Sequence, residues 1–106
     1  MLFHPVAKLA ELLESDAKVV QLEGRQIALF LVGEEVFAYD NFCPHRGGPL
    51  GEGMVRNGCV TCPWHDWSFD LKTGRHVRYA TAALTRYPAR ISGDDVMVSP
   101  TPVTPD

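Results

Sequence analysis

The sequence predicts an all-β fold, a small antiparallel sandwich or barrel interrupted by one loop-rich insert. From Lys18 onward, short apolar runs alternate with turn residues at regular intervals, as in small antiparallel domains. Residues 41–53 break this pattern with a run rich in glycine and proline, which indicates a loop. The whole chain has 106 residues, which is the size of one domain.

Taken in order, residues 5–13 carry one helical signal, because Val6, Leu9, Leu12 and Leu13 fall on one face. We expect one or two turns there, lying against the edge of the barrel. Strands are then expected at residues 19–22, 26–32 and 36–39, separated by turns that contain Gly24 and Gly33.

The insert spans about residues 41–71 and has two irregular stretches around strands at 59–61 and 68–71. The chain returns to β structure at residues 84–91 and 96–98. Residues 100–106 contain three prolines and are expected to form an extended, frayed tail. The prediction is therefore a single domain over residues 1–99, followed by a proline-rich tail at 100–106.

Composition excludes several classes of function. Ten Lys and Arg against thirteen Asp and Glu give a net charge of −3, which argues against a nucleic-acid-binding face. No apolar run approaches the roughly 18–20 residues that span a bilayer, and no signal peptide is visible. We therefore expect a cytoplasmic protein with no membrane partner, and nothing in the sequence demands more than a monomer.

The three cysteines, an odd number, argue against a disulfide scaffold. Two of them belong to a repeated pattern in the insert: Cys43-Pro44-His45, then sixteen intervening residues, then Cys62-Pro63-Trp64-His65. Two thiolates and two imidazoles from two separate loops make a four-ligand metal set.

Two metal groups suit these ligands. In a [2Fe–2S] cluster, two cysteines hold one iron and two histidines hold the other. Such a cluster is about neutral when oxidised, so it accepts an electron more easily than an all-cysteine cluster, at roughly −150 to +300 mV. Structural zinc also accepts two Cys and two His, but its usual spacing keeps like ligands together. The mixed spacing here favours the cluster.

These residues make the chain similar to the Rieske-type iron–sulfur proteins, together with Phe69-Asp70-Leu71-Lys72-Thr73-Gly74 after the second loop. The resemblance covers nearly the whole chain. It implies that Cys43 and Cys62 bind one iron of a single [2Fe–2S] cluster and that His45 and His65 bind the other. It also implies a Rieske-type antiparallel β-sandwich with a cluster-binding subdomain at one end.

Departures from the respiratory-chain branch of that family point to its soluble ferredoxin branch. Gly48 and Trp64 occupy the positions where the respiratory proteins carry a disulfide. Trp67 and Phe69 replace hydroxyl residues that bond near the cluster, so the potential is expected at the low end of the Rieske range. Asp66 stands after His65 where that branch has glycine; a tolerated turn residue is the simplest interpretation.

Other residues have structural interpretations first. Cys59 is expected to be a buried strand residue rather than a third thiolate ligand. His4 and His76 are expected on the surface. Phe42, Trp64 and Trp67 are expected to cover the cluster. The acidic pairs Glu34-Glu35 and Asp94-Asp95 are interpreted first as turn residues. A second interpretation is that they attract a basic partner.

The resemblance implies a one-electron carrier and not an enzyme, since four protein ligands leave no open coordination position for a substrate. Its expected transient partners are a flavin-dependent ferredoxin reductase and a terminal oxygenase of the aromatic-ring hydroxylating dioxygenase type. One alternative is the small Rieske subunit of an assimilatory NAD(P)H nitrite reductase. Another is a zinc-stapled interaction module, which would be colourless where an iron–sulfur protein is brown-red.

Overall fold

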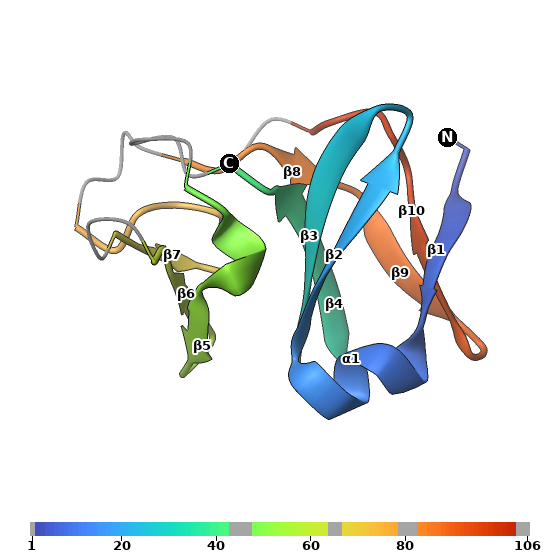
Figure 1. The fold of residues 1–106 in the computed structure, drawn as a ribbon, viewed down its shortest axis with the longest axis horizontal. Coiled ribbons are helices and arrows are strands. Elements are labelled where there is room, and N and C mark those ends of the chain that lie inside the picture. The colour runs from blue at the N-terminus through green and yellow to red at the C-terminus, as the bar shows by residue number, and fades with distance from the viewer. Residues whose placement is uncertain (1, 43–47, 64–66, 79–82, 104–106) are drawn as a thin grey trace.

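The computed structural model describes residues 2–42, 48–63, 67–78 and 83–103 (Figure 1). Two helical segments are α1 (Leu9–Ser15) and the 3₁₀ turn η1 (Leu50–Glu52). The strands are β1 (His4–Lys8), β2 (Ala17–Leu22), β3 (Arg25–Val32), β4 (Glu35–Asp40), β5 (Met54–Arg56), β6 (Cys59–Thr61), β7 (Ser68–Asp70), β8 (Arg86–Tyr87), β9 (Ala89–Ser92) and β10 (Asp95–Val98).

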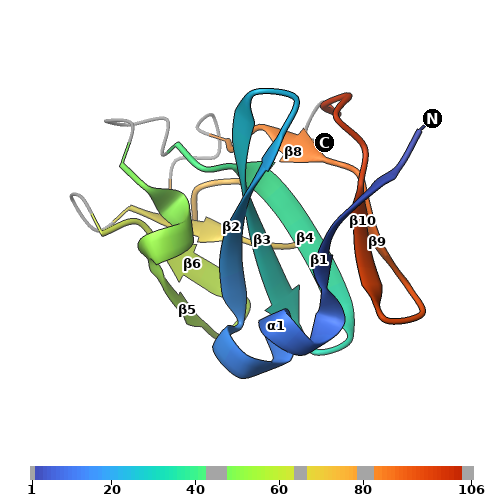
Figure 2. The same cartoon turned by 45° about the vertical axis from the view of Figure 1, so that its right-hand side comes forward.

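The described strands form three sheets with the orders β1-β10-β9, β2-β3-β4-β8 and β5-β6-β7, and every pairing is antiparallel. This confirms the all-β antiparallel fold predicted from the sequence. The β2-β3-β4-β8 sheet lies in the middle, with β1, β9 and β10 on one side and β5, β6 and β7 on the other (Figure 2).

The central position of this sheet explains the unbroken apolar run of β3. Ile27 and Leu29 point into a core shared with Val96 and Val98 of the β1-β10-β9 sheet. The alternate residue Phe30 packs in a second core with the third sheet. A strand buried on both faces needs apolar residues at every position, as parallel sheets usually do.

The second core is the contact between the central sheet and the subdomain that carries the predicted ligands. It is built from both parts: Ala28, Phe30, Phe37 and Tyr39 from the central sheet, and Leu50, Val60, Cys62, Phe69, Leu71 and Leu84 from the rest. Burial of about ten apolar side chains fixes the subdomain on the sheet. The predicted metal loops therefore start from a packed base.

The N-terminal prediction was partly wrong. Residues 4–8 form β1 and the helix begins only at Leu9, whereas the helical pattern was expected from residue 5. The reason is long-range pairing, since His4 lies opposite Val98 and Lys8 opposite Asp95. Within α1, Leu12 is fully buried, and the helix ends at Asp16 in the left-handed conformation, with φ of 63°.

Three further differences concern the C-terminal half. The strand expected at residues 84–91 is divided at Pro88, where the chain leaves β4 and joins β10. The tail is not frayed as far as Val103, whose N–H donates to the carbonyl of Arg86 at 2.8 Å. Strand β5 was not expected, and it pairs with β6. In the part of the chain that the structure describes, no helix is long and apolar enough to cross a bilayer.

Candidate metal centre

The structure describes one of the four predicted ligands, Cys62. The other three, Cys43, His45 and His65, lie outside the described residues, as do Trp64 and Asp66. The assignment of all four ligands therefore stays a prediction. The described residues show how each of the two loops begins and ends.

The second loop is closed at its base by the backbone. Cys62 directly follows β6 and Trp67 directly precedes β7, and these two strands are paired. The Cys62 N–H donates to the carbonyl of Trp67 at 2.7 Å. Beside this closure the hydroxyls of Thr61 and Ser68 bond at 2.8 Å. The hairpin therefore fixes the separation of the two ends of the loop that carries two of the predicted ligands, Cys62 and His65.

Cys62 itself is fully buried and belongs to the core between the subdomain and the central sheet. A hollow of about 330 Å³ lies next to it, with Glu52, Met54 and Pro63 among its lining residues. A thiolate ligand needs shielding from water and a fixed direction, and a cysteine at the base of a closed loop supplies both. The residue present at this position thus fits an iron–sulfur centre.

The first loop is closed by Asn41, a residue that the sequence analysis did not single out. Asn41 is only 4% exposed and follows β4. Its side-chain oxygen accepts the Gly51 N–H at 2.6 Å, and its carbonyl accepts the Leu50 N–H at 3.2 Å. Its amide group donates to Gln26 Oε1 at 3.1 Å, which attaches the loop to β3. Phe42 and Pro49 form an antiparallel bridge one step further out.

Gly51 has to be glycine for this closure. A Cβ atom built there would lie 2.3 Å from Cγ2 of Val19 and 3.0 Å from Oδ1 of Asn41. The close approach of Gly51 to Val19 brings η1 against β2, so this end of the first loop packs on the central sheet. An asparagine at the end of a strand, ten residues before a glycine, was the available signal in the sequence. It was too weak to be recognised, because asparagine is common at any loop start.

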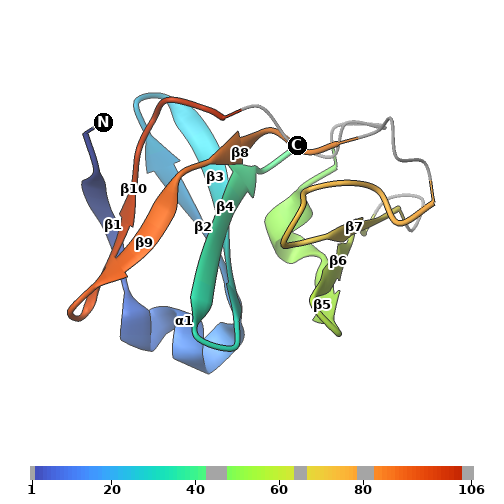
Figure 3. The ribbon, with the colours of Figure 1, turned by 180° about the vertical axis from the view of Figure 1, so that it is seen from behind.

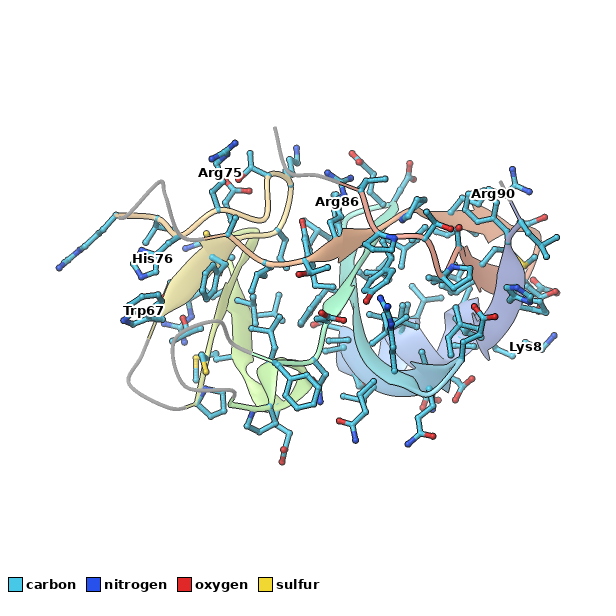
Figure 4. All side chains as sticks on the ribbon, turned by 90° about the horizontal axis from the view of Figure 1, so that it is seen from above. Lys8, Trp67, Arg75, His76, Arg86 and Arg90 are labelled. Carbon is cyan, nitrogen blue, oxygen red and sulfur yellow. The ribbon has the colours of Figure 1, made fainter. Side chains whose placement is uncertain are left out.

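His76 is buried, at 7% exposure, so the expectation of a surface residue was wrong. Its ring meets Trp67 edge-on at 4.6 Å between centroids and Phe69 at 5.4 Å. Its Nδ1 accepts the backbone N–H of Arg78 at 2.9 Å. Figure 4 shows His76 and Trp67 side by side, with Trp67 directly before β7. Pairing of His76 with Phe69 in a β-bridge explains this burial, and no local pattern announces it.

The predicted aromatic cover is divided between two environments. Trp67 is partly buried beside Phe69 at 6.2 Å, whereas Phe42 is 54% exposed. Neither Trp67 nor Phe69 carries a hydroxyl, as the sequence indicated. Tyr39 of the central sheet, which shares a core with Phe69, donates its hydroxyl hydrogen to the carbonyl of Leu71. That hydrogen bond ties the subdomain to the central sheet.

Cys59 lies in β6, as expected, and is partly rather than fully buried. Desolvation is the main cause that raises the pKa of its thiol, and the nearby Asp70 raises it further. Cys59 begins β6 and Cys62 follows its end, and three extended residues span about 10 Å. Both the distance and the raised pKa disfavour Cys59 as a third thiolate ligand of the same centre.

Comparison with known proteins gives a consistent result. A family model described as the Rieske [2Fe-2S] domain matches residues 3–88. The ferredoxin component of the naphthalene 1,2-dioxygenase system of Pseudomonas aeruginosa is 35% identical over 91 residues, which cover 85% of this chain and 88% of the relative. The anthranilate 1,2-dioxygenase ferredoxin subunit of Burkholderia cepacia is 34% identical over 98 residues, with 92% and 91% covered.

Among solved structures, the ferredoxin of carbazole 1,9a-dioxygenase from Nocardioides aromaticivorans matches with a TM-score of 0.85. The match covers 95% of this chain and 100% of that ferredoxin, at 23% identity. At this level of identity the likeness establishes the fold alone.

Proposed function

Because this chain belongs to the Rieske [2Fe-2S] family, we propose that it carries single electrons from a flavin-dependent ferredoxin reductase to a terminal oxygenase. The observation that carries this proposal is similarity along nearly the full length of two ferredoxin components, together with the four-ligand pattern. The chain is then a component of a multicomponent oxidoreductase and not itself an enzyme. Its oxygenase is of the aromatic-ring hydroxylating dioxygenase type.

The chain binds one Rieske-type [2Fe–2S] cluster, and the family match decides against structural zinc. We infer that Cys43 and Cys62 hold one iron and that His45 and His65 hold the other. When bound, the cluster accepts and releases one electron without binding substrate. The protein supplies the rest: two loops closed at Asn41 and at the Cys62–Trp67 hydrogen bond, and a packed base.

The potential is proposed to lie at the low end of the Rieske range. Hydrogen bonds to cluster sulfurs stabilise the reduced state, and hydroxyl donors provide them in higher-potential relatives. Here Trp67 and Phe69 offer no hydroxyl, and Tyr39 donates its own to Leu71. The proposed domain is residues 1–99, with a cluster-binding insert at about 41–71, in a cytoplasmic monomer.

The test is an EPR-monitored redox titration of anaerobically purified protein. A rhombic Rieske-type signal that appears only on reduction, near −150 mV, supports the proposal. Protein without iron or without such a signal refutes it. A nitrite reductase small subunit would give the same signal, but it would remain bound to a large catalytic chain. Exchange of electrons by the isolated, monomeric chain therefore distinguishes the carrier from that subunit.

A further inference from the structure

Charge is unevenly distributed in this protein. Residues 71–93 contain five basic residues and no Asp or Glu, although the whole chain has a net charge of −3. Four of the five basic residues form what we call the basic edge, which consists of Lys72, Arg75, Arg78 and Arg86. Lys72 and Arg78 are exposed, and the other two are partly buried.

The fold brings the basic edge together from two segments. Arg75 forms a β-bridge with Ala83, and the Arg86 guanidinium donates to the carbonyl of Lys72 at 3.1 Å. Figure 4 shows Arg75 and Arg86 along the same side of the molecule. Acidic neighbours offset this charge only in part. The Asp70 carboxylate accepts the Lys72 N–H at 2.8 Å, and Glu34 and Glu35 share a hollow with Arg86.

The basic edge adjoins the second ligand loop. Val77 donates its N–H to the carbonyl of Ser68 at 3.0 Å, next to Trp67 at the loop's end. His76, between Arg75 and Arg78, contacts the Trp67 ring. Trp67 in turn accepts the N–H of Cys62. A partner lying on the basic edge is therefore also next to the loop that holds two of the predicted cluster ligands.

The far end of the molecule is acidic. Helix α1 and the β3–β4 and β9–β10 turns lie together at that end, while β8, which carries Arg86, is at the other (Figures 1 and 3). The carboxylates of this acidic end are Glu11, Glu14, Asp16, Asp94 and Asp95, whereas Glu34 and Glu35 of the β3–β4 turn share the hollow with Arg86. Two lysines partly offset them through ion pairs, Lys8 with Asp95 at 2.6 Å and Lys18 with Glu11 at 2.7 Å.

We propose that the basic edge is the surface on which an electron-transfer protein with an acidic face docks. The proposal rests on the proposed function, because it assumes that electrons pass through the neighbouring loops. A molecule with one acidic and one basic end turns in the field of a charged partner. An acidic partner attracts the basic edge and repels the α1 end. The first collision is thereby biased toward an orientation in which the second loop faces the partner.

Binding is tested first, by NMR on the ¹⁵N-labelled protein at low salt, with hexaglutamate as an acidic peptide probe. We expect amide shifts at residues 72–78 and 84–87 and none at residues 9–16 or 94–95. A probe that shifts no amides, or shifts both ends alike, overturns the proposal. A thymidine oligonucleotide of equal charge that binds more tightly than the peptide also overturns it, in favour of a phosphate site.

Electron exchange is tested second, by stopped-flow oxidation of the reduced protein. Ferricyanide takes one electron from the cluster and becomes ferrocyanide, and hexaammineruthenium(III) is the cationic counterpart. If the basic edge governs the encounter, the ferricyanide rate falls as salt is added, although the protein is negative overall. A ferricyanide rate that rises with salt refutes the proposal.

Two matched variants locate the effect. Lys72→Gln/Arg78→Gln removes two charges from the basic edge, and Lys8→Gln/Arg56→Gln removes two charges elsewhere. At low ionic strength we expect the first to slow ferricyanide about fivefold and the second to have less than about half that effect. Equal effects refute the basic edge as the docking surface. Both variants are also checked by EPR. A normal Rieske-type signal shows that the cluster is intact, so equal effects would then refute the docking surface and leave the proposed function standing.

Discussion

Replacing Asn41 with leucine removes the polar groups that close the first ligand loop while keeping the number and branching of the non-hydrogen side-chain atoms. The change deletes the bond from Gly51 N–H to Oδ1 and the bond from the amide to Gln26. Leaving the partly buried Gly51 N–H unsatisfied costs about 1–3 kcal/mol, and the Gln26 bond contributes about 1 kcal/mol. We expect the free energy of unfolding to fall by about 2–4 kcal/mol in total.

The assay is anaerobic urea unfolding of the holoprotein followed by circular dichroism, with iron per chain measured in parallel. Gln26→Ala is the matched control, because it removes one half-exposed hydrogen bond and should cost only about 0.5–1 kcal/mol. Asn41→Asp keeps the acceptor for Gly51 and should fall between the two. We also expect Asn41→Leu to lose iron, because the ends of its ligand loop are less well held. If Asn41→Leu is no less stable than Gln26→Ala and retains its iron, the loop-closure argument is wrong.

Three further predictions concern charge, ionisation and backbone conformation. His45→Cys should lower the reduction potential from the Rieske range toward the roughly −400 mV of all-cysteine ferredoxins, because a second thiolate adds negative charge; a rise measured by EPR titration would contradict this. Burial raises the pKa of Tyr39 to about 12, so the unfolded chain releases this proton first and stability should fall as the pH rises from 10 to 12. Tyr39→Phe should flatten that dependence in urea unfolding; an unchanged slope would show that other groups cause it. Gly74→Ala should lower the free energy of unfolding by about 2–3 kcal/mol, because φ is 78° and the new Cβ would lie 2.9 Å from Tyr39. The control Gly93→Ala, at φ of 61° with no atom within 4 Å, should lower it by only about 1 kcal/mol. Equal losses of stability would mean that the contact with Tyr39 is harmless.

The central strands could be predicted from the sequence because their apolar runs and turn glycines are local signals. β3 and β4 begin and end within one residue of the expected ranges. β1 could not be predicted, because its strand conformation comes from pairing with β10, about ninety residues along the chain. Residues 5–8 carry a local helical pattern, but pairing with β10 makes them a strand. The division of residues 84–91 depends on two different sheets meeting at Pro88, which no single stretch encodes.

The candidate site shows the same division between local and distant signals. The four predicted ligands form a pattern of spacing, which a sequence displays directly. The residues that hold the loops do not. Asn41 acts through Gly51 and Gln26, and His76 through Trp67 and Phe69, so each role exists only after the chain has folded. Sequence analysis therefore finds the metal chemistry of such a site more readily than its mechanical support.

The acidic pairs show why charge in particular has to be placed in space. Glu34-Glu35 and Asp94-Asp95 do lie at turns, and as pairs they suggested attraction of a basic partner. The β9–β10 turn, which carries Asp94-Asp95, and the strands β5, β6 and β7 lie on opposite sides of the central sheet, so attraction at that turn would direct those strands away from the partner (Figure 3). The proposed docking requires the second loop to face the partner, and the basic edge beside the described end of that loop is positive. In the proposed docking, the charge that meets the partner is therefore opposite in sign to the net charge of the chain.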